Sequence, residues 1–375
     1  MAVCPTGALS YTCNTDGLAD ISVDQNKCIK CGRCFKVCSA NKQQDFTGYF
    51  RGIECKSYYL GYNADEAVRR ESSSGGVCKT LIIGALRSGL VDGVYTLRAL
   101  DKYPSAEGEF YTKENIPEFK DIPNSIYHSV LQCQQLKKVS RCKRLMIVGT
   151  SCQLLALEQA LHGKYDSLIK VCIFCKQQKS LASTRFLAKI SGTKISQPYN
   201  FTARYRGLGW PGEVSINGGM VPWHRAAQVP FGRRLWTVPG CDGCGDPFGF
   251  IAGADITLMD PWTIRTGNDL GETLTIASTP QGDELLRSID TLVLEPKKYD
   301  EIVPALGLTD VKRKQALVPY FYGEKCSVRL RMAGGAERMQ RAMLRGLVAG
   351  PAMPMIYYRA LCKLPDLRNL ILGKL

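Results

Sequence analysis

The chain has 375 residues, and its 45% apolar and 22% charged content is typical of a globular protein with two or three domains. It has no run of about 18 apolar residues, which argues against a transmembrane helix. The first residues lack the basic and then apolar layout of a signal peptide, so we expect a cytoplasmic protein. In that compartment, seventeen cysteines favour metal binding or redox chemistry over disulfides.

The formal net charge is +15. Basic proteins can bind nucleic acid, anionic lipid, phosphate-bearing cofactors or acidic partner proteins. Neither a nucleic-acid-binding module nor a basic stripe with interleaved aromatic residues accompanies the charge, so we expect no nucleic-acid partner. We expect attraction to phosphate-bearing cofactors and to an acidic redox partner instead.

The most informative segment is the C-x2-C-x2-C-x3-C run from Cys28 to Cys38. Bacterial ferredoxins with [4Fe–4S] clusters have this spacing, and in their two-cluster forms the fourth Cys of the run ligates the other cluster. The missing ligand is therefore expected upstream, in the segment CPTGAL. We predict that one cluster is held by Cys4, Cys28, Cys31 and Cys34, and that Cys38 lacks its usual partners.

Two accounts of Cys38 stay open: the protein has lost one cluster, or the chain begins inside a longer two-cluster module. A zinc knuckle made from four of the five thiols is the alternative to iron, although structural zinc sites usually separate two cysteine pairs by a longer loop. We expect residues 1–45 to form a ferredoxin-like α+β module, with a short strand at 19–24 before the cysteine loop.

Residues 46–70 are mixed and aromatic, which suggests a connector that packs against the main domain. An amphipathic helix is predicted over 77–87, then a strand over 91–97 and an irregular surface segment over 101–125. Hydroxyls and glycines at a helix N-terminus let backbone N–H groups approach an anion. The segment before the helix therefore indicates a phosphate- or flavin-binding loop, with a simple N-cap as the alternative. Its residues are Ser72, Ser73, Ser74, Gly75 and Gly76.

Strands and helices then alternate. Buried strands are predicted at 144–149 and 168–175, each followed by a helix. This order with short turns predicts parallel pairing and an α/β core with a mixed or parallel sheet. Ligands of such sheets bind at the carboxyl ends of the strands. A strand at 273–277 and a helix at 279–289 follow later in the chain.

A second group of cysteines belongs to this region. Cys152 and Cys175 fall at the carboxyl ends of the two predicted strands, so we expect them to lie near each other. Cys241 and Cys244 form a C-x2-C pair further on. Together these four thiols equal the number that a second [4Fe–4S] cluster needs. The alternatives are a redox dithiol at Cys241 and Cys244, and ordinary buried cysteines at the other two positions.

The segment from Lys325 to Leu375 is basic, with ten Lys or Arg against two acidic residues. Apolar residues recur there at helical spacing, namely Met339, Met343, Leu344, Leu347 and Val348. A basic amphipathic helix of this kind binds a membrane surface or the groove of a partner protein. Packing against the protein's own body is the other interpretation.

In their order and spacing, these segments resemble the coenzyme F420 hydrogenase/dehydrogenase beta subunit family. The resemblance covers most of residues 1–320 and not the basic tail. Two departures stand out: Ser151 occupies a position where the family often has proline, and the first ferredoxin cysteine triplet is absent. The matching segments are Ser72 to Gly76 with Val77, Leu90 to Val94, Val148 to Gln153, Phe174 with Cys175, Cys241 to Cys244, and Ala254 to Ile256 followed by Asp260 and Trp262.

The resemblance implies an FAD-dependent iron–sulfur oxidoreductase that passes electrons between [4Fe–4S] clusters and FAD, and on to coenzyme F420 or another organic substrate. Ferredoxin or another redox protein would be its partner. The Ser72 to Gly76 loop becomes the candidate for FAD contact, and Arg204 or Arg206 the candidate for an anionic part of FAD or substrate. No catalytic acid or base is predicted.

Two other functions stay open: a non-catalytic electron-transfer subunit that docks on a partner enzyme through the basic tail, and a zinc-stabilised scaffold. The predicted organisation has four parts. They are a ferredoxin-like module at 1–45, the family's N-terminal region with the flavin-binding loop at 46–130, its C-terminal α/β region at 131–320, and a basic, partly helical tail at 321–375.

Overall fold

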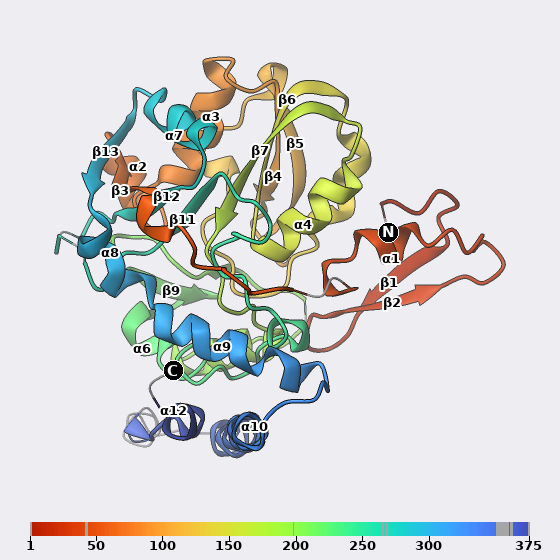
Figure 1. Cartoon of the computed structure of the whole chain (residues 1–375), viewed down its shortest axis with the longest axis vertical. Helices are drawn as coiled ribbons and strands as arrows, with labels where there is room; N and C mark the ends of the chain where they lie inside the picture. Colours follow the sequence, from red (N-terminus) through yellow and green to blue (C-terminus); the bar gives the residue numbers. More distant parts are fainter. Residues whose placement is uncertain are drawn as a thin grey trace.

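An eight-stranded mixed sheet forms the centre of the computed structural model, in the order β13-β3-β12-β11-β7-β6-β4-β5 (Figure 1). The structure describes residues 2–41, 44–197, 199–264, 266–267, 269–349, 360 and 363–373. Strands β4, β6, β7 and β11 are parallel, and the other pairs are antiparallel. The strands are β3 Ser57–Asn63, β4 Gly93–Ala99, β5 Ala106–Thr112, β6 Cys142–Gly149, β7 Tyr165–Ile173, β11 Ile256–Met259, β12 Thr273–Ala277 and β13 Leu292–Lys297.

Helices cover both faces of this sheet. Because successive side chains of a strand point to opposite faces, Val94 packs with Leu81 of α3 on one side, while Tyr95 belongs to the core with Leu154 of α4 on the other. Helix α7 joins α3 on its face. The helices are α2 Glu66–Glu71, α3 Val77–Arg87, α4 Ser151–Ala160, α7 Pro280–Arg287 and α8 Tyr299–Leu306. The predicted α/β fold class is confirmed.

A smaller antiparallel sheet lies beside the large one, in the order β10-β9-β8. Helix α5 begins after Ser180 and packs its buried face on this sheet together with α6. The elements are α5 Leu181–Ile190, β8 Ala203–Arg204, β9 Glu213–Ile216, β10 Gly219–Pro222 and α6 Trp223–Ala227.

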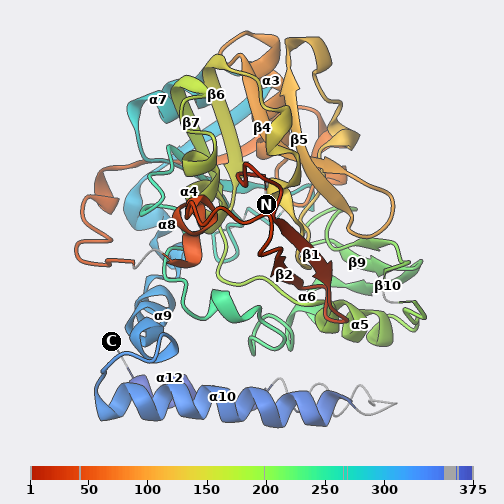
Figure 2. The same ribbon diagram turned by 90° about the vertical axis from the view of Figure 1, so that its right-hand side faces the viewer.

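The N-terminal module projects from the side of the body (Figures 1 and 2). It consists of an antiparallel hairpin, β1 Leu9–Cys13 with β2 Ala19–Val23, and the short helix α1 Arg33–Val37. Helix α1 lies against α4. The cysteine loop is therefore next to the helix that follows β6.

The C-terminal helices form the lower end of the molecule in both views. They are α9 Leu308–Phe321, α10 Val328–Ala349 and α12 Leu367–Leu372. Leu344 and Val348 of α10 pack with Phe186 of α5, so part of the tail does pack on the body. Met339, Met343 and Leu347 are exposed. In the described part of the chain, no helix has both the length and the apolar character needed to cross a membrane.

Two local predictions are wrong. Residues 57–63, within the predicted connector, form the interior strand β3, and residues 106–112, within the predicted surface segment, form the edge strand β5. Strand β3 pairs with β12 and β13, more than 200 residues away in sequence, so no local pattern reveals its place. The β5 sequence AEGEFYT contains glycine and two glutamates, which are poor strand formers, and its pairing with β4 outweighs that preference.

Candidate functional site

The functional groups predicted from sequence gather at one edge of the large sheet. The parallel strands β6, β7 and β11 end there, followed by Cys152, Cys175 and Asp260 respectively. Strand β3 runs in the same direction as β11, and the N–H of its last residue, Asn63, donates to the carbonyl of Gly75 at 2.8 Å. The Ser72 to Gly76 loop therefore lies at this carboxyl edge, where ligands of α/β sheets bind.

Four thiols, which we call the inner cysteine set, lie near enough to one another for their charges to interact: Cys152, Cys175, Cys241 and Cys244. Burial raises the pKa of Cys175, and the charges of the other three raise it further. Burial also raises the pKa of Cys241. The Sγ of Cys241 accepts a hydrogen bond from the N–H of Gln178 at 3.3 Å. The positive charge of bound iron would offset the repulsion between these thiolates. A set of four thiols therefore suits an iron–sulfur cluster.

Two C-terminal helices hold the loops that carry the inner cysteine set. Lys314 of α9 donates from Nζ to the carbonyl of Lys176, beside Cys175. Its neighbour Gln315 donates to the carbonyl of Gly245, beside Cys244, at 2.9 Å. Arg341 of α10 reaches both carboxylate oxygens of Asp242, at 3.0 Å each. Asp242 lies between Cys241 and Cys244, so α9 and α10 clamp the segment after Cys175 and the segment that carries Cys241 and Cys244.

The clamp belongs to a buried network of charges. Asp242 also accepts from Arg234 at 3.2 Å, and Glu337 of α10 pairs with both Arg234 and Arg341. Arg368 of α12 extends the network to Glu337 at 3.8 Å. Sequence reasoning missed Glu337, Arg341 and Arg368, because they are ordinary charged positions of the C-terminal helices, more than 90 residues from the cysteines they support.

The outer cysteine set, Cys4, Cys28, Cys31 and Cys34, has a different setting. Cys31 and Cys34 are exposed, and the loop between them turns through Gly32 at φ 70°. The Sγ of Cys4 accepts from the N–H of Ala8 at 3.3 Å. Hydrogen bonding, chiefly from the Thr6 hydroxyl, lowers the pKa of Cys4 to about 7. A low thiol pKa favours the thiolate that iron binds.

Cys38 ends α1, where its N–H donates to the carbonyl of Phe35 at 3.3 Å. Its lack of a role as a ligand stays a prediction. Within the described residues, no three or more His, Cys, Asp and Glu side chains converge on a point that suits a single metal ion.

The Ser72 to Gly76 loop is held tightly from several sides. Ser72 donates to the carbonyl of Val68 at 2.7 Å and ends α2. Ser74 donates to the carbonyl of Glu272, and the N–H of Gly75 donates to the Thr273 hydroxyl at 3.1 Å. A Cβ on Gly75 would lie 2.4 Å from the carbonyl oxygen of Gly61, so only glycine fits there. Gly76 has a φ of 79° just before α3 begins.

Arg206 braces the same loop from outside. Its side chain is 1% exposed, and it donates to the Ser73 carbonyl at 2.7 Å and to Asp260 at 2.9 Å. The rings of Trp223 and Trp262 lie 4.8 and 5.4 Å from its guanidinium carbon. Its charge is thus already paired, which distinguishes it from Arg204.

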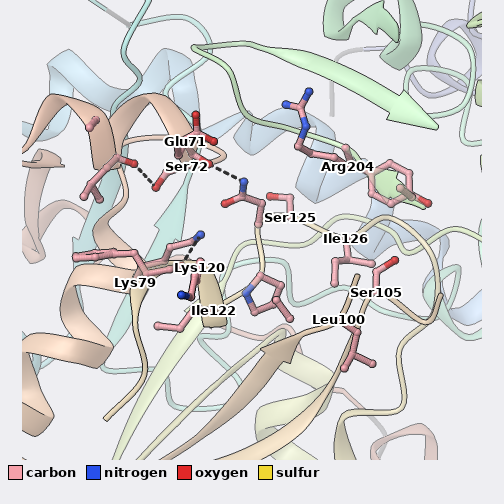
Figure 3. Close-up of a pocket in the computed structure, with 18 residues that line it drawn as sticks. Glu71, Ser72, Lys79, Leu100, Ser105, Lys120, Ile122, Ser125, Ile126 and Arg204 are labelled. Atoms are coloured by element: carbon pink, nitrogen blue, oxygen red, sulfur yellow. Dashed lines mark hydrogen bonds between the residues drawn. The ribbon is translucent and has the colours of Figure 1, made fainter. Parts of the chain in front are cut away.

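Arg204 lines a cavity of about 470 Å³ with Ser72 and Ser125 (Figure 3). Three buried polar atoms of this lining have no hydrogen-bond partner among the described residues: Arg204 Nη1, Asn124 Oδ1 and Ser105 Oγ. Buried polar groups are normally paired, so these atoms indicate room for a polar ligand. The structure thus brings Arg204 and Ser72 to one cavity and places Arg206 behind the loop.

Ser151, at a position where the family often has proline, makes a hydrogen bond that proline could not make. Its hydroxyl donates to the buried carboxylate of Asp246 at 2.5 Å, and Tyr49 donates to the other carboxylate oxygen at 2.6 Å. This ties the start of α4, beside Cys152, to the segment that follows Cys244. Proline has no group that could donate to this carboxylate.

The fold and the N-terminal motif define the chain as an iron–sulfur α/β protein, because a model of the 4Fe-4S binding domain matches residues 21–42. Two models of the coenzyme F420 hydrogenase/dehydrogenase beta subunit match as well, its N-terminal part at residues 58–116 and its C-terminal part at 142–301. Together they span more than half of the chain, which therefore belongs to this family. The predicted family is confirmed. Helices α9, α10 and α12 begin after the last matched residue.

Among solved structures, the chain is similar to one from the F420-reducing [NiFe] hydrogenase complex of Methanosarcina barkeri, studied by xenon derivatization. The two are 21% identical with a TM-score of 0.49, over 69% of this chain and 88% of that chain. No curated protein matches the chain.

Proposed function

We propose that the protein is an FAD-dependent iron–sulfur oxidoreductase that moves electrons between [4Fe–4S] clusters and FAD, and on to coenzyme F420 or another organic substrate. The carrying observation is that the exposed outer cysteine set packs, through α1, on the helix whose first turn bears Cys152 of the inner set. FAD supplies the exchange of single electrons for an electron pair. The protein supplies position and electrostatics.

The outer set is the proposed entry point. Its ligands are Cys4, Cys28, Cys31 and Cys34, and the exposure of Cys31 and Cys34 leaves them within reach of a docking redox protein. Ferredoxins are acidic partners of the kind that a net charge of +15 attracts. The proposed inner ligands are Cys152, Cys175, Cys241 and Cys244, of which Cys152 is exposed and the other three are half-buried.

The cavity beside Arg204 is the proposed place for part of FAD or for the substrate. Its volume of about 470 Å³ is within the ~300–1,000 Å³ usual for ligand sites. Arg204 would pair there with an anionic group, and Ser72 is the member of the Ser72 to Gly76 loop that lines the cavity. The whole loop, with Ser73, Ser74, Gly75 and Gly76, stays our candidate for contact with FAD. Arg206 acts on this site through Ser73, because its own charge is paired with Asp260.

A reducing compartment is required for two sets of cluster-bound thiolates, which supports a cytoplasmic location. The family's description as a beta subunit favours one alternative function. In that case the chain relays electrons for a catalytic partner and has no substrate of its own.

The test is anaerobic purification followed by quantitation of iron, acid-labile sulfide and flavin in one sample. About eight irons with one FAD per chain supports the proposal. Zinc without flavin would contradict it. Turnover of an organic acceptor by the isolated chain with an artificial electron donor separates the oxidoreductase from the relay subunit, which would show none.

A further inference from the structure

Helix α10 presents a second apolar face that the body does not cover. Its inward face packs on the protein through Ala333, Leu344 and Val348. Five large apolar side chains on the opposite side are each at least half exposed. At about 100° per residue they fall within one arc of roughly 100°. We call this the α10 stripe: Val328, Met332, Met339, Met343 and Leu347.

Positive charge borders the stripe. Arg331, Arg338 and Arg345 recur at every seventh residue, so they form a row along one side of it, and all three are exposed. Glu337, the only acidic residue of α10, is buried against the body and pairs with Arg234 and Arg341. The outward surface of α10 therefore combines apolar side chains with positive charge alone.

The position of α10 leaves this surface accessible. Figure 2 shows the helix lying lengthwise across one end of the molecule, with α12 beside it. Leu370 of α12 is also exposed. Because this 22-residue helix is packed on the body along its inner side, a groove could not surround it. Its outer side instead offers a long contact for a flat surface.

We propose that the α10 stripe docks the protein on an anionic lipid surface. Apolar side chains of an interfacial helix enter the boundary between headgroups and acyl chains, while bordering arginines reach lipid phosphates through their flexible stems. Charge complementarity favours lipid over a second copy, because two copies face to face would bring two arginine rows together without an acidic residue to pair them. The proposal is independent of the redox function.

The test is co-sedimentation of the full-length holoprotein with vesicles of phosphatidylcholine, with and without phosphatidylglycerol. We expect binding only to the anionic vesicles, and weakening by added salt. Replacing Arg331, Arg338 and Arg345 together by glutamine should weaken binding on the order of a hundredfold, from the contribution of each arginine near such a surface. The double variant Met339→Glu, Met343→Glu should abolish it.

Met220→Glu is the matched control, since Met220 is 57% exposed on β10, away from α10, and should leave binding unchanged. Equal iron and flavin contents in all variants show that the fold is kept. If the variant Met339→Glu, Met343→Glu loses iron, its fold is altered, and the arginine variant alone tests the proposal. The proposal is overturned if the unaltered protein ignores anionic vesicles, or if the arginine variant binds as well as the parent. It is also overturned if the protein is a dimer that Met339→Glu, Met343→Glu turns into monomers.

Discussion

The outer and inner cysteine sets are built in opposite ways. Three outer thiols lie within seven residues of one loop, and two of them are exposed. The inner thiols come from three distant segments, and Lys314, Gln315 and Arg341 of the C-terminal helices hold two of these, the segment of Cys175 and that of Cys241 and Cys244. A local motif is enough for the exposed site that we propose as the entry point for electrons. The inner set instead needs long-range packing to bring its thiols to one edge of the sheet.

The largest expected effect is the loss of a whole cluster. Cys175→Ser should remove about four irons by destroying the inner site, and Cys28→Ser should remove about four by destroying the outer one. Cys38→Ser should remove none. Iron and acid-labile sulfide assays on anaerobically purified variants measure this. Equal losses from Cys28→Ser and Cys38→Ser would refute our ligand assignment.

The clamp on the inner set should be measurable as stability. Arg341→Met leaves Asp242 and Glu337 without one of their partners in a buried network, which should cost about 3 kcal/mol of unfolding free energy. Arg331→Met on the exposed face of the same helix is the control and should change it by less than about 1 kcal/mol. Denaturant unfolding compares the two, and similar costs would mean that the network does not hold α10 in place.

Lys314 should affect the reduction potential of the inner cluster and not that of the outer one. Its ammonium faces Cys244, Cys241 and Cys175, and a positive charge stabilises the reduced, more negative cluster. Lys314→Met should therefore lower the inner reduction potential by on the order of 50 mV and leave the outer potential unchanged. Redox titration followed by electron paramagnetic resonance resolves both signals. An unchanged inner potential, with full iron content, would contradict this role.

The thiols should differ in reactivity in the metal-free protein. Thiolate is the reactive form, so labelling grows as pH rises through the pKa. Cys4, with its pKa lowered to about 7, should react with iodoacetamide at half its maximal rate near neutral pH. Cys175, whose pKa burial raises, should stay unlabelled up to pH values where Cys4 has reacted fully. Mass spectrometry of digests measures the labelling of both residues. Identical pH profiles would contradict the predicted difference between their pKa values.

Sequence reasoning reached the features that depend on short spacing. The β6-α4-β7 unit and the cysteine loop both follow from neighbouring residues. It missed β3, whose partners are more than 200 residues away, and it missed the clamp, because Asp242 finds Arg341 only through tertiary folding. The spacing also could not separate Arg204 from Arg206, which differ in whether a carboxylate already pairs with them.

The most direct test of the two-site account is the rate of flavin reduction by a reduced ferredoxin, followed by flavin absorbance in a stopped-flow instrument. The comparison is between the parent protein and Cys34→Ser, which should lose the outer cluster and keep the inner one. The account predicts that Cys34→Ser abolishes rapid reduction by ferredoxin, while dithionite, a small reductant, still reduces the flavin. Unchanged rapid reduction by ferredoxin in Cys34→Ser would show that electrons do not enter at the outer cysteine set.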